Sequence, residues 1–117
     1  MANDHEALKR ELERYAEEKG VPIIRGPERE LLLQAAALAE PRRILEIGTA
    51  IGCSALLLAE RFPEAEIDTV ELDEGRHHKA EEVMERAGFA GRVHCHLGDA
   101  GNLISTLSGP YDFLFLD

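Results

Sequence analysis

Apolar and polar residues alternate along this chain with two different periods. Within residues 4–19, Leu8, Leu12, Tyr15 and Ala16 recur at the spacing of one helix face. Short apolar runs such as residues 43–47 are bounded instead by turn-forming residues, as strands are. The pattern predicts helices over residues 4–19, 27–39, 53–61, 73–87 and 102–107, and strands over residues 43–47, 66–71, 92–97 and 111–116.

Strands that alternate with helices predict an α/β fold built on a parallel sheet. Right-handed crossovers between the four strands give the order 3-2-1-4, with helices on both faces of the sheet. We expect residues 1–42 to form a helical cap on a core of residues 43–117, all within one globular unit. A chain of 117 residues is long enough for one hydrophobic core.

The connection between the first strand and the helix over residues 53–61 is bracketed by Gly48 and Gly52. Glycines let a backbone turn sharply close to a ligand, and the helix that follows presents free N–H groups. Dinucleotide-binding loops carry glycine at the first, third and sixth positions, but Ala50 and Cys53 occupy the last two here. The spacing disfavours an NAD enzyme, and the lack of a phosphate-binding lysine disfavours a P-loop.

Acidic residues stand at the ends of the first three predicted strands, as Glu46, Glu71 and Asp99. Ligands bind outside the carboxyl ends of parallel strands, so these residues should converge on one crevice. A carboxylate there can accept hydrogen bonds from both hydroxyls of a ribose or from an amine. The alternative is structural: the two glutamates could accept loop N–H groups, and Asp99 could cap the next helix.

Composition limits the location and the partners. The N-terminus is polar and the apolar runs are too short to span a bilayer, so we expect a cytoplasmic protein without a membrane partner. Two cysteines make a disulfide scaffold unlikely on count alone. The net charge is −10, and the acidic excess lies almost entirely in residues 44–117. That half suits a cationic ligand and repels a phosphate backbone.

Four motifs together resemble the class I S-adenosylmethionine-dependent methyltransferases, which have a Rossmann-like fold. They are Glu46–Gly52, Glu71, Gly98–Ala100 and Tyr111–Asp117. Within this class the chain looks like the metal-dependent O-methyltransferases that include the caffeoyl-CoA enzymes. Residues 15–24 are similar to a bacterial subgroup that methylates 5-hydroxyuridine in tRNA.

The resemblance implies a role for each motif. Glu46 and the loop of Gly48–Gly52 would hold the methionine part of S-adenosylmethionine, Glu71 its ribose, and Asp99 its adenine. Asp117 would be a ligand of Mg²⁺ or another divalent cation. Cys53 departs from the family, which usually has an aromatic residue there. The implied cofactor-binding residues are Glu46, Gly48, Thr49, Gly52, Ser54, Glu71, Asp99 and Ala100.

The implied activity is methyl transfer to a hydroxyl of a small molecule or a modified tRNA uridine, with metal assistance and no protein nucleophile. The family continues for three further strands, two more metal ligands and most of the substrate pocket. We therefore interpret the chain as the N-terminal portion of such an enzyme, inactive alone. The apolar strand over residues 111–116 and the helix over residues 4–19 predict a homodimer. The alternative is an inactive module that binds cofactor and dimerises.

Histidines raise a separate metal hypothesis. His94 and His96 lie on one face of a predicted strand and Cys95 on the other, and no acidic partner is close to them in sequence. We interpret them as structural. Residues 76–79, which include His77 and His78, read as the solvated face of a helix.

Overall fold

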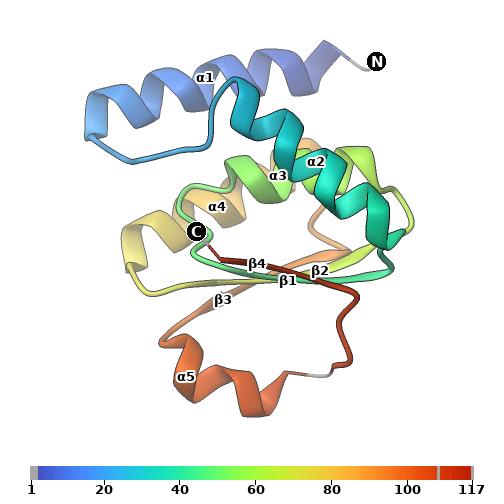
Figure 1. Cartoon of the computed structure of the whole chain (residues 1–117). Coiled ribbons are helices and arrows are strands. Elements are labelled where there is room, and N and C mark those ends of the chain that lie inside the picture. Colours follow the sequence, from blue (N-terminus) through green and yellow to red (C-terminus); the bar gives the residue numbers. More distant parts are fainter. Residues whose placement is uncertain (1–2, 108, 117) are drawn as a thin grey trace.

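A computed structural model describes residues 3–107 and 109–116. It has a single sheet between two layers of helices, with α1 to α4 above the sheet and α5 below it (Figure 1). The helices are α1 (Asn3–Lys19), α2 (Pro27–Ala39), α3 (Cys53–Arg61), α4 (Glu74–Ala87) and α5 (Ala100–Leu103), followed by the 3₁₀ helix η1 (Ile104–Thr106). The strands are β1 (Arg43–Ile47), β2 (Glu66–Glu71), β3 (Val93–Leu97) and β4 (Phe113–Leu116).

The four strands form a parallel sheet in the order β3-β2-β1-β4. This confirms the predicted order 3-2-1-4 and the placement of helices on both faces. Because parallel strands end at one edge of the sheet, the residues that follow β1, β2 and β3 are brought together. No described helix is long and apolar enough to cross a membrane.

One face of the sheet packs against α3 and α4, on which α2 and α1 lie in turn, and we call it the four-helix face (Figure 1). Ile44 of β1 and Ile67 of β2 are register partners on this face and are fully buried. They join one apolar cluster with side chains from the helices above, including Leu12 of α1 and Leu56 of α3. The helical cap and the strands therefore share a single core.

The opposite face of the sheet lies towards α5, and we call it the α5 face. Alternation of side chains along the strands puts Asp68, His94, Leu114 and Leu116 on this side. The two leucines are 54% and 65% exposed. The short α5 thus leaves much of this face uncovered within the described residues.

The amphipathic stripe of α1 is satisfied inside the chain. Leu8, Leu12 and Ala16 are all buried against the core. This removes one of the two reasons for expecting a homodimer. Exposed apolar residues lie instead on α2, where Leu38 is 89% exposed.

Two elements start two residues away from their predicted positions, and the other starts agree to within one residue. The helix predicted over residues 102–107 begins earlier, at Ala100, because the Asp99 carboxylate caps it by accepting the Gly101 N–H at 2.7 Å. The strand predicted from residue 111 begins at Phe113. Before that point Asp112 is tied to the start of β1: its Oδ2 accepts the backbone N–H groups of Arg42 and Arg43 at 2.6 and 2.9 Å, and its own N–H donates to the Arg43 carbonyl at 2.7 Å.

Candidate functional site

The carboxyl ends of β1, β2 and β3 enclose a cavity of about 290 Å³. Four of the predicted site residues line it together, namely Gly48, Glu71, Asp99 and Ala100. Its remaining wall is mostly apolar and is formed by Ile47, Val70, Leu72 and Gly98. A flat ring system can lie against such a wall while the carboxylates take its polar groups.

A second cavity, of about 270 Å³, also borders Glu71. It is lined by Pro22, Gly48, Ala50, Glu71 and Arg76. Gly48 and Glu71 therefore border both cavities. Pro22, from the linker between α1 and α2, and Arg76, on the first turn of α4, were not among the predicted site residues.

The loop between β1 and α3 has the left-handed backbone that its glycines predict. Gly48 and Gly52 have φ values of 100° and 98°. Ala50 also has a positive φ, 51°, which is uncommon for a residue with a side chain. The loop is tied to the end of β2, because the N–H groups of Gly48 and Thr49 donate to the Val70 carbonyl at 2.8 and 3.0 Å.

Glu71 holds the unusual turn of this loop in place. Its Oε1 accepts the Ala50 N–H at 2.7 Å, and its Oε2 accepts the Asp73 N–H at 3.0 Å. The residue is 8% exposed. The structural alternative is thus realised for Glu71, whose carboxylate fixes two loops. Each oxygen still has a lone pair for a ligand hydroxyl.

Glu46 lies deeper than its position in the sequence indicates. It is fully buried on the four-helix face, and its Oε1 accepts the Thr69 hydroxyl at 2.6 Å. The Thr69 and Thr49 hydroxyl oxygens are also 2.6 Å apart. These residues form a buried polar chain beneath the loop. Glu46, Thr49 and Ser54 are buried and line neither cavity, so their predicted cofactor contacts remain predictions.

The other predicted residues are placed as follows. Gly52 caps α3, and a Cβ built on it would lie 3.1 Å from the Met84 side chain. Cys53 is buried behind the loop, and burial raises the pKa of its thiol to about 11. Asp117, the expected metal ligand, lies outside the described residues.

His94 and His96 each have an acidic partner, which the sequence reading did not find. The Nε2 atom of His94 is 2.8 Å from Glu66, and that of His96 is 2.8 Å from Asp68. Both carboxylates come from β2, so they are distant in sequence and adjacent in the sheet. The signal was present as polar residues at every second position of two strands predicted to be neighbours. The pairs support the structural interpretation of these histidines.

Asp68 is the centre of this polar set. The Tyr111 hydroxyl donates to its Oδ2 at 2.8 Å, and an Arg43 nitrogen lies 3.5 Å from the same oxygen. Burial alone would raise the pKa of Asp68, but the hydrogen bonds from His96 and Tyr111 bring that pKa below its ordinary value. The group therefore acts as an ionised acceptor on the α5 face.

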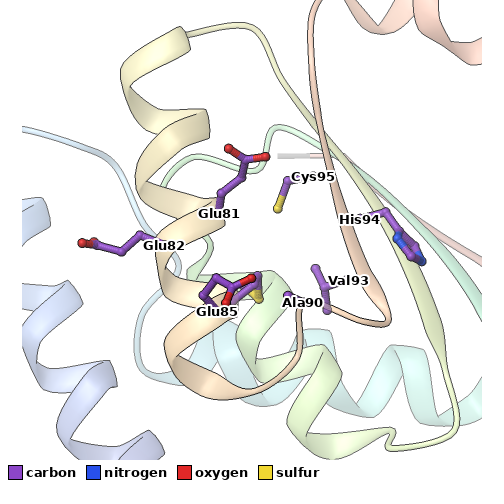
Figure 2. A pocket seen from close by; sticks show the side chains of 8 residues that line it. Glu81, Glu82, Glu85, Ala90, Val93, His94 and Cys95 are labelled. Carbon is purple, nitrogen blue, oxygen red and sulfur yellow. The ribbon is translucent and has the colours of Figure 1, made fainter.

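A groove of about 480 Å³ runs along the outer edge of β3, away from both cavities. Figure 2 shows Glu81, Glu82 and Glu85 on the α4 side of this groove and Cys95 on the β3 side. Burial raises the pKa of the Cys95 thiol to about 11. None of the predicted cofactor residues lines the groove.

The loop, the acidic strand ends and the strand order together define a methyltransferase-type α/β core. The chain belongs to the O-methyltransferase family, which it matches over residues 1–117. This confirms the resemblance drawn from the motifs.

Several known proteins that are similar to this chain are named as O-methyltransferases. It is 37% identical over 116 residues to a probable O-methyltransferase of Mycobacterium tuberculosis. It superposes on the O-methyltransferase TomG of Streptomyces achromogenes, solved in complex with S-adenosylmethionine, with a TM-score of 0.83 and 31% identity. A putative caffeoyl-CoA O-methyltransferase of Staphylococcus aureus gives a TM-score of 0.84 at 27% identity.

The chain spans about half the length of these relatives. The match covers 91% of the chain but 50% of the mycobacterial protein. It covers 94% of the chain and 52% of TomG, and 91% of the chain and 51% of the staphylococcal protein. The narrower similarity to enzymes that methylate 5-hydroxyuridine in tRNA stays a prediction.

Proposed function

We propose that this chain is the cofactor-binding half of an S-adenosylmethionine-dependent O-methyltransferase. The observation that carries the proposal is the position of Glu71, whose carboxylate borders two cavities at the carboxyl ends of the strands. An adenosine attached to an amino acid has this arrangement, with a ribose between two larger groups. The solved relative TomG was obtained in complex with this cofactor.

The residues present fit that ligand. The ribose hydroxyls would donate to Glu71, which keeps acceptor capacity beyond its two backbone N–H groups. The adenine would lie in the cavity of Asp99 and Ala100, and the methionine part in the cavity of Pro22 and Arg76. The acidic balance of the chain favours a cationic sulfonium.

Methyl transfer requires the protein to align the acceptor oxygen, the methyl carbon and the sulfur, and it needs no nucleophile from the protein. The acceptor oxygen forms a bond to the methyl carbon as the carbon–sulfur bond breaks, the electron pair of that bond stays on sulfur to give a neutral thioether, and the hydroxyl proton passes to water. A divalent cation such as Mg²⁺, when bound, would lower the pKa of that hydroxyl. Its expected ligand is Asp117, and one carboxylate holds Mg²⁺ weakly. We propose that further ligands, the acceptor pocket and any dimer contact belong to the longer enzyme.

Replacement of Glu71 tests the cofactor site. We expect Glu71→Gln to weaken binding of S-adenosylmethionine and its demethylated product by about 30-fold or more, because one acceptor oxygen is replaced by an NH₂ donor and the other loses its charge. Calorimetric titration measures the affinity. Glu66→Gln, at the exposed opposite end of β2, is the matched control and should bind normally. Unchanged affinity in a folded Glu71→Gln variant would contradict the proposal.

A further inference from the structure

We propose that α4 carries a separate binding site for Zn²⁺ or another divalent cation of intermediate hardness, formed by His77, His78 and Glu81. One possible ligand atom from each of these side chains lies within 4.8 Å of the other two. The site uses none of the residues that line the two cofactor cavities. It also does not involve Asp117, so it does not depend on the proposed methyltransferase activity.

The geometry of a helix brings these three side chains together. Successive residues are about 100° apart around the axis, so Glu81 projects between His77 and His78, one turn further along. Side chains lean towards the helix N-terminus, which carries the Glu81 carboxylate back to both rings. Its Oε2 lies 3.4 Å from His77 Nε2, and its Oε1 lies 3.4 Å from His78 Nδ1.

These separations suit tetrahedral coordination. Zinc binds imidazole nitrogen at about 2.0–2.1 Å, which puts neighbouring ligand atoms about 3.3–3.4 Å apart. The carboxylate of Glu81 already stands at that distance from both rings. The two distances belong to different oxygens of Glu81, so the carboxylate would rotate to bring one oxygen between the two nitrogens, and water would complete the shell.

A further carboxylate is placed to orient His78. Glu74 lies one turn before the histidines, and its Oε2 is 3.7 Å from His78 Nε2. A histidine that binds metal through one nitrogen commonly directs its other N–H at a carboxylate. With Nδ1 on the cation, Nε2–H would point at Glu74.

The side chains around the proposed site allow a cation to bind, but they limit its affinity. Lys79 is turned away from the histidines, towards Glu82 at 2.9 Å and the ring of Tyr15. His77 is buried, and its Nδ1 has no hydrogen-bond partner among the described residues. Coordination through Nε2 would leave the proton on that nitrogen. We expect this to weaken binding about 10- to 100-fold relative to a fully bonded site.

The ligand types select the metal. Imidazole nitrogens suit Zn²⁺, Co²⁺ and Ni²⁺, whereas Mg²⁺ prefers oxygen ligands and gives up water reluctantly. Cys95 lies across the groove from Glu81 in Figure 2, but its sulfur is not part of the group of ligand atoms that lie within 4.8 Å of one another. It is therefore not included in the ligand set.

The test is a titration of the tag-free chain with Zn²⁺ at neutral pH, with Co²⁺ as a spectroscopic probe. We expect one site of about micromolar affinity, a visible Co²⁺ absorption typical of nitrogen and oxygen ligands, and no competition from excess Mg²⁺. His78→Ala and Glu81→Gln should each weaken Zn²⁺ binding about 10-fold or more. Both side chains are exposed, so the variants should fold normally.

Three matched variants serve as controls. His94→Ala removes a histidine from another histidine–glutamate pair, Glu82→Gln changes a neighbouring carboxylate, and Cys95→Ser removes the nearest thiol. All three should bind Zn²⁺ like the original chain. The proposal is overturned if the chain binds no Zn²⁺ at about 100 μM. It is also overturned if His78→Ala and Glu81→Gln leave the affinity unchanged, or if His94→Ala weakens it equally.

Discussion

The two faces of the sheet are made from alternate residues of the same strands, yet one is a buried apolar surface and the other is polar and partly exposed. On the four-helix face, Ile44 and Ile67 are fully buried in an apolar cluster to which all four overlying helices contribute. On the α5 face, Asp68 gathers polar partners from three other segments, and Leu114 and Leu116 stay largely exposed.

This difference locates the stability of the chain. Burial of apolar surface is the main driving force of folding, and here it is concentrated above the sheet. The α5 face contributes hydrogen bonds and ion pairs, whose net effect per contact is smaller. The candidate cofactor cavities lie beyond the carboxyl ends of the strands, so they belong to neither face of the sheet.

The largest effect is expected from emptying the four-helix face. Ile67→Ala should lower the free energy of unfolding by about 2–5 kcal/mol, because a fully buried side chain is replaced by a cavity. Leu116→Ala, on the α5 face, should change it by less than about 0.5 kcal/mol. Urea denaturation followed by circular dichroism measures both. Equal losses would remove the distinction between the faces.

A smaller, pH-dependent effect is expected on the α5 face. Asp68→Asn should cost about 2 kcal/mol near pH 7, because the carboxylate accepts charge-assisted hydrogen bonds. The pKa of Asp68 is below its ordinary value in the folded chain. Its stabilising contribution is therefore present above the ordinary aspartate pKa of about 3.9 and is lost as the pH falls through the folded value.

Urea denaturation at several pH values from neutral to acidic tests this sign. The difference between the original chain and Asp68→Asn should be greatest near neutral pH and shrink in acid. Tyr111→Phe, which removes one of the donors to Asp68, should show the same trend with a smaller amplitude. A difference that grows in acid would contradict the role given to Asp68.

The smallest effect is expected where the four-helix face meets the loop. Gly52→Ala should cost about 1–2 kcal/mol, because Gly52 has a left-handed backbone and its new Cβ would lie 3.1 Å from the tip of Met84. The Met84 side chain is flexible and can move. Gly91→Ala, where a Cβ would meet nothing within 4 Å, is the control and should be close to neutral in thermal melting.

The arrangement of the sheet could be predicted from the sequence because periodicity and turn residues act locally. The strand order followed from the alternation of strands and helices, and the positive φ of Gly48 and Gly52 followed from their place in a tight turn. The start of β4 could not be predicted in this way. It depends on Asp112 accepting N–H groups from residues about 70 positions earlier in the chain.

The candidate site was predictable as a location and less so in detail. Glu71 and Asp99 end their strands, so their convergence follows from parallel topology. Glu46 lies inside β1, where alternation turns it towards the core, and its partner Thr69 belongs to the neighbouring strand. Pro22 and Arg76 lie outside the four motifs to which cofactor contacts were assigned, and only the packing of the helices brings them to Glu71.

The contacts of Glu71 bear on how quickly a ligand can bind. Ala50 has an uncommon backbone with a positive φ, and a residue of the chain itself, Glu71, holds it by accepting its N–H. Because these contacts are internal to the chain, we expect a ribose to bind without a slow rearrangement of the loop beforehand. Association should show a single kinetic phase whose rate rises in proportion to ligand concentration, as encounter-limited binding does.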